Sequence, residues 1–260
     1  MDSETLLTST RSARRSLDLS APLDAAQIRD CLQIAFHAAN GSNQQSWQWI
    51  VVEDPDLRRE IAAVYRKSYL RMTGGAMVSD LLPDDEFGRL MSSTEWLVTH
   101  LAQVPLHVIP CYEPYLPDFG DEDGPFQLAT LYGSIFPAVW NFQLALHTRG
   151  FGSCITTMHL LYQEEVATLL GIPDSYVQGC LLPVARLRPG TVFRSPPRRP
   201  AEDVVAIDTW GEVTNLAQRR ERHTVDEIIE RKLMDRIDRV EIRDCLTRYA
   251  RGSTCELAGD

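Results

Sequence analysis

The sequence predicts a mixed α+β or α/β domain in which helices dominate. Short apolar runs have the length and composition of buried strands at residues 48–52, 105–110 and 177–186. The segments between them are longer, and their apolar residues recur at helical spacing. With 260 residues, 44% of them hydrophobic, the chain is long enough for one large domain, or for one domain with an appendage.

Composition excludes several classes of partner. The net charge of −10 argues against nucleic acid and against an anionic membrane surface, because both attract basic proteins. The first residues are acidic and contain no apolar run, so we expect no signal peptide, and no stretch approaches the roughly 20 apolar residues of a membrane span. The six cysteines are scattered without a CxxC pair. We therefore expect reduced thiols in a cytoplasmic protein, with no disulfide frame and no metal site.

Local signals mark the expected helices. Asp24 and Gln27 have the form of a capping box, which predicts a helix that closes near His37. Pro55 at a first helical position predicts a second helix, to about Met72.

The segment 133–147 is apolar on nearly every side, so we expect a central core helix that ends at Gly150. Residues 112–126 are expected to form a long loop, whose aromatic residues Tyr112, Tyr115 and Phe119 would cover a flat substrate unless the loop is disordered.

Two arginine clusters stand out in this acidic chain. Arg11, Arg14 and Arg15 fall within five positions and surround Ser12, and Arg198 and Arg199 form a second patch. Guanidinium groups with a hydroxyl suit a phosphate monoester, because charge-assisted bonds match its oxygens. The alternative is a solvated basic turn.

Two stretches of small residues offer close approach to a ligand. Residues 38–47 contain only small and amide side chains before Trp47, and residues 152–157 read Gly-Ser-Cys-Ile-Thr-Thr. Such backbone comes near a flat molecule because little Cβ bulk intervenes. An ordinary helix-to-strand turn is the alternative for the first stretch. Together with the arginines, these turns are what a planar cofactor with a phosphate requires.

In combination these segments resemble the nitroreductase family of FMN-dependent oxidoreductases, over roughly residues 8–210. The resemblance rests on five stretches in the family's order: Arg11-Ser12-Ala13-Arg14, residues 39–47, residues 150–154, residues 170–173, and Arg198 to Glu202. Ala39 and Ser46 stand where the family commonly has proline, and Thr10 stands where it commonly has a basic residue.

The resemblance implies a three-layer α-β-α sandwich with a mostly antiparallel central sheet. It also implies a homodimer with FMN at the interface, to which both chains contribute. The cofactor-binding residues that it implies are Arg11, Ser12, Arg14, Arg15, Ala39, Asn40, Gly41, Ser42, Asn43, Gln45, Thr156, Thr157, Arg198 and Arg199. Thr156 and Thr157 would approach the flavin through backbone groups.

The implied activity is transfer of hydride from NADH or NADPH, with two electrons passing to a small acceptor such as a nitroaromatic or a quinone in a ping-pong reaction. The sequence contains no convincing catalytic triad, carboxylate pair or metal cluster, so we expect no catalytic side chain: the flavin carries the chemistry. Cys154 is expected to be structural rather than redox-active. The alternatives are a flavin-holding protein with little turnover, a flavin-dependent dehydrogenation, and a nucleotide-binding regulator without flavin.

The chain extends beyond the implied domain. We expect an FMN-binding domain at 1–211 and a helical extension at 212–260, where apolar residues recur at helical spacing. Residues 235–252 resemble the first helix of SnoaL-like domains, either as a truncated fusion or by coincidence of a common helical pattern.

Overall fold

The computed structural model describes residues 2–79, 82, 85–114 and 124–206. The chain divides into two compact units, which are described separately: Met1–Met77 with Arg89–Pro196, and Val78–Gly88 with Pro197–Asp260. The predicted domain boundary after residue 211 and the SnoaL-like helix lie outside the described residues, so both remain predictions.

One antiparallel sheet runs through the first unit. Its path follows the order β1 (Leu17–Asp18), β6 (Leu182–Leu187), β3 (Leu106–Tyr112) and β2 (Trp47–Val52). β4 (Phe151–Ser153) also pairs with β6, and β5 (Val177–Gln178) pairs with β3. The register sets Ile50 opposite Ile109, and Leu106 opposite Val184. Every strand pair is antiparallel, so this part of the prediction is confirmed.

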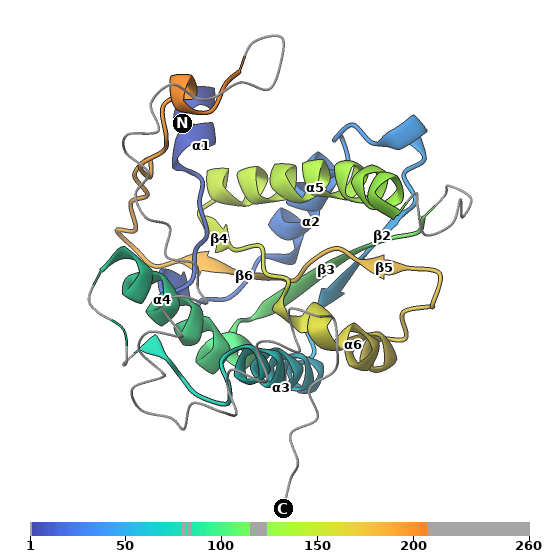
Figure 1. The fold of residues 1–260 in the computed structure, drawn as a ribbon, viewed down its shortest axis with the longest axis horizontal. Helices are drawn as coiled ribbons and strands as arrows, with labels where there is room; N and C mark the ends of the chain where they lie inside the picture. Colours follow the sequence, from blue (N-terminus) through green and yellow to red (C-terminus); the bar gives the residue numbers. More distant parts are fainter. Residues whose placement is uncertain (1, 80–81, 83–84, 115–123, 207–260) are drawn as a thin grey trace, which may run out of the picture. The chain divides into compact units, whose positions relative to one another are not determined.

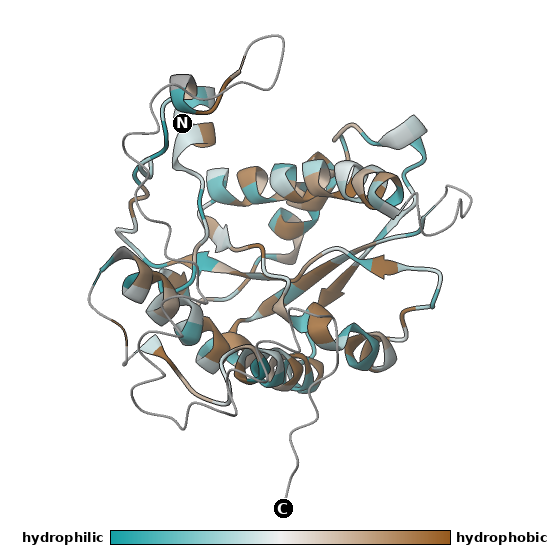
Figure 2. Cartoon of the chain, viewed as in Figure 1, coloured by the Kyte–Doolittle hydropathy of each residue, from teal (hydrophilic) through white to brown (hydrophobic). Residues whose placement is uncertain are grey.

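Helices cover both faces of this sheet (Figure 1). α2 (Ala25–Ala35) and α5 (Gly124–Thr148) pack on one face, around Val108. α3 (Pro55–Met72), the 89–100 part of α4 (Glu86–His100) and α6 (Gln163–Leu170) pack on the other face, around Ile109. Adjacent residues of β3 serve opposite cores because side chains alternate along a strand. Figure 2 accordingly shows β3 as mainly hydrophobic, and the predicted three-layer sandwich is confirmed.

Short elements complete the described chain. They are α1 (Ser3–Ser9) and the 3-10 turns η1 (Gly41–Asn43), η3 (Leu101–Gln103), η5 (Met158–Tyr162) and η6 (Ala201–Asp203). α1, β1 and β4 were not predicted; the two strands have two and three residues, too few for a recognisable alternation. Among the described residues, no helix combines the length and apolar character that crossing a bilayer requires.

The predicted helix starts are present, although Gln27 bonds the Asp24 carboxylate at 2.9 Å instead of completing the capping box through the backbone. The Asp24 side chain accepts hydrogen bonds from the backbone N–H groups of Ala26 and Gln27, and Pro55 opens α3. Gly150 ends α5 with a φ of 74°. That left-handed conformation is open to glycine because no Cβ meets the preceding carbonyl.

α5 differs from the prediction in two respects. It begins at Gly124 rather than at Gly133. It is also not buried on every side, since Phe126 and Leu128 are 55% and 52% exposed while Ile135 and Phe142 lie in the core. α5 is therefore buried along its middle and its C-terminal part and carries exposed apolar residues near its start.

Two further expectations were wrong. The apolar run 177–186 is not one strand, because the three residues 179–181 stand opposite only two of β3 and shift the register by one between β5 and β6. Gly179 still donates a 2.8 Å hydrogen bond to the carbonyl of Pro110 in β3. Tyr112 belongs to β3 and is fully buried, so it cannot cover a substrate. Tyr115 and Phe119 lie outside the described residues.

Candidate functional site

The arginine segment 11–15 is fixed to the sheet through its one buried residue. Ala13 is 1% exposed, and its backbone N–H donates a 2.8 Å hydrogen bond to the carbonyl of Ser153 in β4. Ser12 before it is exposed and Arg14 after it is half-buried. The anchor therefore sets the backbone from which the polar side chains project.

Gly152 makes this anchor possible. A Cβ at position 152 would lie 2.7 Å from Cβ of Ala13 and 2.5 Å from Cδ2 of Leu187, well inside van der Waals contact. The stretch 152–157 was predicted to let another group come close. At Gly152 the group that comes close is the protein's own arginine segment.

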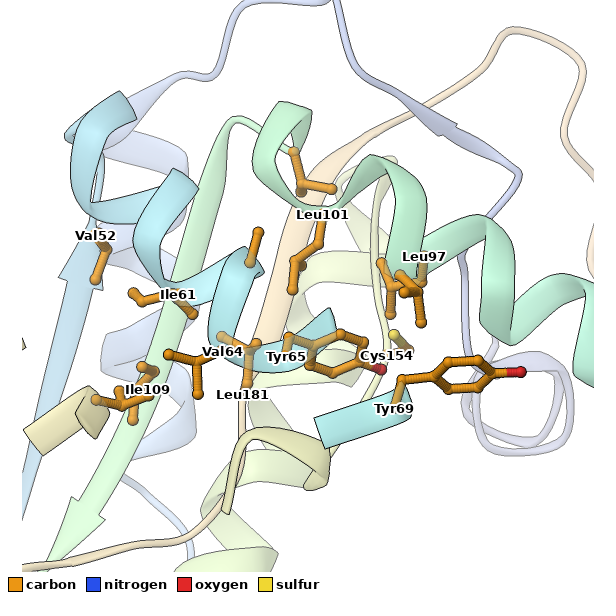
Figure 3. Packing of buried hydrophobic residues seen from close by; sticks show 14 of the residues in the cluster. Val52, Ile61, Val64, Tyr65, Tyr69, Leu97, Leu101, Ile109, Cys154 and Leu181 are labelled. Carbon is orange, nitrogen blue, oxygen red and sulfur yellow. The ribbon is translucent and has the colours of Figure 1, made fainter. Parts of the chain in front are cut away.

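Arg14 and Thr156 meet at one buried tyrosine. Tyr65 of α3 is 1% exposed, and its hydroxyl lies 2.9 Å from Oγ1 of Thr156. The guanidinium of Arg14 acts electrostatically on both the Tyr65 hydroxyl and the Cys154 thiol. Figure 3 shows the Tyr65 hydroxyl beside the Cys154 sulfur. Two of the predicted site residues, distant in sequence, are thus brought together.

Arg14 has an unused donor in this group. Within the described part of the chain, its Nε atom is buried and has no hydrogen-bond partner. A buried donor without a partner costs about 1–3 kcal/mol, and more when it is charged. An anion beside Arg14 would remove that cost, so the residues present fit a phosphate group at this point.

Burial governs the ionisable groups here. It raises the pKa of Tyr65 to about 12, although the hydrogen bond to Thr156 and the charge of Arg14 act in the opposite direction. Burial also raises the pKa of Cys154 to about 11, again against the effect of Arg14. Cys154 is therefore a neutral thiol at physiological pH, and the reactive thiolate is disfavoured.

The other residues of the arginine segment differ in availability. Arg11 and Ser12 are exposed. Arg15 is already held by α4, since its Nη2 donates to the carbonyl of Ser92 at 3.1 Å and to the Ser92 hydroxyl at 2.6 Å. Thr10 caps α1 by donating from Oγ1 to the carbonyl of Leu6, which accounts for a threonine where the family commonly has a basic residue.

The backbone of Thr156 is occupied. Its N–H donates to the carbonyl of Leu181 at 3.0 Å, and its carbonyl accepts from the N–H of Leu181 at 2.8 Å. Thr156 is half-buried and Thr157 exposed. The carbonyl of Thr157 accepts from the N–H of Leu160 at 3.0 Å, so the side chain of Thr156 and the N–H of Thr157 are better placed to meet a ligand than the backbone of Thr156.

The segment 39–45 is a strained turn. Ser42, Asn43 and Gln45 have φ values of 50°, 52° and 50°, in the left-handed region that costs residues with a side chain free energy. Asn40 holds the turn together, since its Oδ1 accepts from the N–H of Gln45 at 3.0 Å. Ala39 and residues 42–45 are exposed, while Asn40 and Gly41 are half-buried.

This turn lies away from the arginine segment. Its contact with the helical layer is a 3.0 Å hydrogen bond from the N–H of Gly41 to Oγ of Ser134 in α5. Figure 1 shows α1, which leads into the arginine segment, near one end of α5 and the 41–43 turn near the other. Among the described residues, the hydrogen bonds of the turn do not reach residues 11–15 or 156–157.

Arg198 and Arg199 belong to the second unit. Within that unit both bond to backbone carbonyls: Arg198 to Pro197 at 3.1 Å, and Arg199 to Asp203 at 2.6 Å. Both residues are exposed. Among the described residues there is no group of three or more His, Cys, Asp or Glu side chains that would hold a metal ion.

Sequence reasoning missed Tyr65. The residue occupies an apolar position of the α3 helical repeat, and that position explains a core residue without any polar role. No local signal marks its contact with Thr156, because the two residues are far apart in the chain. Only the packing of α3 against the segment after β4 reveals it.

In class, this is an α-β-α sandwich in which the arginine segment 11–15 is anchored to the small-residue stretch 152–157. The chain belongs to the nitroreductase family: the family model described as "Nitroreductase family" matches residues 7–186.

Solved structures share the fold at low sequence identity. An iodotyrosine deiodinase bound to FMN and 3-iodo-L-tyrosine has a TM-score of 0.60 at 21% identity, over 80% of this chain and 99% of its own. A BluB-like flavoprotein from Clostridium difficile 630 has a TM-score of 0.59 at 20% identity, over 80% and 100%. An FMN and NADPH-dependent nitroreductase, NfnB from sphigopyxis sp. strain HMH, has a TM-score of 0.58 at 18% identity, over 81% and 100%.

Proposed function

We propose that this protein is an FMN-dependent oxidoreductase that takes hydride from NADH or NADPH and passes two electrons to a small acceptor, such as a nitroaromatic or a quinone, in a ping-pong reaction. The observation that carries the proposal is the group formed by Arg14, Tyr65 and Thr156. It sets a half-buried guanidinium with an unpaired Nε near a half-buried threonine hydroxyl. Membership of the nitroreductase family supports the same reading.

The chain's own residues would bind and orient the cofactor. Arg14 and Arg11, with the hydroxyl of Ser12, would hold the phosphate through charge-assisted hydrogen bonds. Thr156 and Thr157 would meet the ring system, and Arg198 and Arg199 remain proposed phosphate ligands. When bound, FMN supplies the hydride and electron chemistry that amino-acid side chains lack. Arg15 is a weaker ligand in this proposal because Ser92 already engages it.

The proposed assembly is a homodimer in which the 39–45 turn serves the partner's cofactor. The separation of this turn from the arginine segment within one chain supports such an arrangement. Exposed apolar residues of α5 support it as well, because Leu128 and Trp140 are 52% and 36% exposed. Residues 39–43 and Gln45 would then line the flavin from the second chain.

The proposal extends to substrates and compartment. NAD(P)H and the acceptor would use the flavin pocket in turn, since the sequence has no separate dinucleotide-binding glycine motif. A cytoplasmic location suits the four cysteines in the described residues, which are free and buried.

The first experiment is a visible absorption spectrum of the purified full chain, reconstituted with FMN if colourless, before and after anaerobic NADH and then NADPH. We expect flavin bands that bleach with at least one donor and return when a quinone is added. Flavin that stays oxidised with both donors would favour a flavin-holding protein. A chain that remains colourless after incubation with FMN would contradict the proposal.

The dimer has its own test. We expect sedimentation to give a dimer for the wild type and a monomer with weaker FMN binding for Trp140→Glu. Met72→Glu is the matched control, because Met72 is 49% exposed at the end of α3, on the opposite side of the sheet. A monomeric wild type that still binds FMN tightly would contradict the shared site.

A further inference from the structure

We propose that Tyr65 is a positioning residue for the flavin site: its hydroxyl donates to Oγ1 of Thr156 and thereby leaves the Thr156 hydroxyl proton free to point at the bound ring system. The inference rests on the proposed function, since the ligand that Thr156 would meet is FMN. It concerns a residue of α3 that the motifs of the family resemblance do not include.

The first support is the rigidity of the pair. Tyr65 is 1% exposed and packs in the core with Leu97 and Leu181 (Figure 3), so its hydroxyl cannot turn to solvent. Thr156 is fixed by two backbone hydrogen bonds to Leu181, of 3.0 and 2.8 Å. The 2.9 Å contact between the two hydroxyls is therefore set by the fold on both sides.

The second support is the direction of the hydrogen bond. A phenol is the more acidic hydroxyl and an aliphatic alcohol is the better acceptor, so Tyr65 is the natural donor to Thr156. The guanidinium of Arg14 favours the same direction, because a nearby positive charge attracts the phenol oxygen and turns its proton away. A threonine hydroxyl has one proton and two lone pairs. With one lone pair taken by Tyr65, its own proton remains available.

The Thr156 hydroxyl therefore points its proton away from buried Tyr65 and toward the side on which Thr156 is half-exposed. A fixed donor beside the flavin ring favours the more electron-rich reduced form, because it stabilises added negative charge without reorganising. Loss of the Tyr65 hydroxyl would remove the bond that holds the Thr156 side chain, so its hydroxyl would be free to rotate and would donate less well to the ring. The flavin midpoint potential should then fall.

The test uses the full-length FMN-loaded protein and the variants Tyr65→Phe, Thr156→Val, Thr156→Ser and the Tyr65→Phe/Thr156→Val double variant. The readouts are the midpoint potential, the flavin absorption spectrum and the FMN dissociation constant. Tyr69→Phe is the matched control: Tyr69 lies one turn along α3, is equally buried, and donates to Glu95 instead of to Thr156.

We expect Thr156→Val to lower the potential, and Tyr65→Phe to lower it in the same direction with about fivefold weaker FMN binding, as for one lost hydrogen bond. The double variant should match Thr156→Val alone, because Tyr65 acts through Thr156. Thr156→Ser should stay near the wild type, and Tyr69→Phe should leave the potential unchanged.

A Tyr65→Phe protein with wild-type potential and spectrum would overturn the inference, as would additive effects in the double variant. If Tyr65→Phe does not fold, Thr156→Val carries the test alone, and an unchanged potential in that variant would overturn the inference. Failure of the wild type to bind FMN is a different result, since it removes the proposed function itself.

Discussion

The core anchors the chain around Arg14 and Thr156, whereas the 40–45 turn depends mainly on its own hydrogen bonds. On the first side, Ala13 bonds to β4, Gly152 leaves space for it, and Tyr65 fixes Thr156. On the second side, Asn40 closes the turn and a single bond from Gly41 reaches α5.

The difference separates two ways of preparing a binding site. On the anchored side, core packing positions Arg14 and Thr156. Substitutions there should therefore lower both the free energy of unfolding and the FMN affinity. The turn holds Ser42, Asn43 and Gln45 in left-handed conformations, each of which costs of order 1–3 kcal/mol. Substitutions in the turn should change the FMN affinity without lowering the free energy of unfolding.

Acid should lower the free energy of unfolding of the fold. His159 lies three residues after Thr156, and His107 lies in β3; both side chains are fully buried. Burial lowers the pKa of each imidazole to about 4. The charge of Arg58 lowers the pKa of His107 further, and His107 lowers that of His159. In the unfolded chain each imidazole takes up a proton near pH 6.5, whereas in the folded chain it does so only near pH 4. The free energy of unfolding is therefore highest above pH 6.5 and falls by about 3 kcal/mol per imidazole as the pH drops to about 4.

Urea unfolding at pH 7.5, 6 and 5 measures this loss. His159→Gln should flatten the dependence, because it removes a group that the unfolded chain protonates. An unchanged slope in that variant would contradict the assignment.

The loss of FMN affinity on replacing each arginine should follow how available its guanidinium donors are. Arg14→Ala should weaken FMN binding by about 2–3 kcal/mol, as expected for a charged hydrogen bond in a partly buried place. Arg11→Ala should cost less because Arg11 is exposed, and Arg15→Ala least because Ser92 already engages Arg15. Fluorescence titration with FMN gives the order, and equal losses at Arg14 and Arg15 would refute it.

Gly152→Ala should destabilise the chain by about 1–3 kcal/mol, the usual cost of forcing a methyl group into a packed core. The new Cβ would meet Cβ of Ala13 at 2.7 Å, so FMN binding should weaken as well. Thermal unfolding and FMN titration check both effects. Gly133→Ala is the control, because a Cβ there meets no atom within 4 Å.

Gln45→Gly should change the free energy of unfolding least, and it should change stability and FMN binding in opposite directions. Glycine accepts a φ of 50° without strain, so the free energy of unfolding should rise by up to about 1 kcal/mol. If Gln45 contacts the flavin from the partner chain, FMN binding should nevertheless weaken. Improved stability with improved binding would contradict the proposed role of this turn.

Local sequence signals predicted the frame of the fold well. Asp24, Pro55 and Gly150 act within one turn of their own helix ends, so their effects can be read without tertiary structure. The arginine and small-residue stretches marked segments that include Arg14 and Thr156 for the same reason: the residue types themselves limit the chemistry. Tyr112 failed as a predicted surface residue because aromatic side chains suit a buried strand as well as a binding loop.

The sequence by itself determined the residue types of the site, the main helix boundaries and an alternation of strands and helices, because these depend on neighbours along the chain. Only the tertiary structure decided that Gly152 faces Ala13, that Ser92 holds Arg15, and that Tyr65 lies behind Thr156. It also decided that apolar residues near the start of α5 are exposed. Such contacts depend on how distant segments pack, and the same local pattern is compatible with many packings.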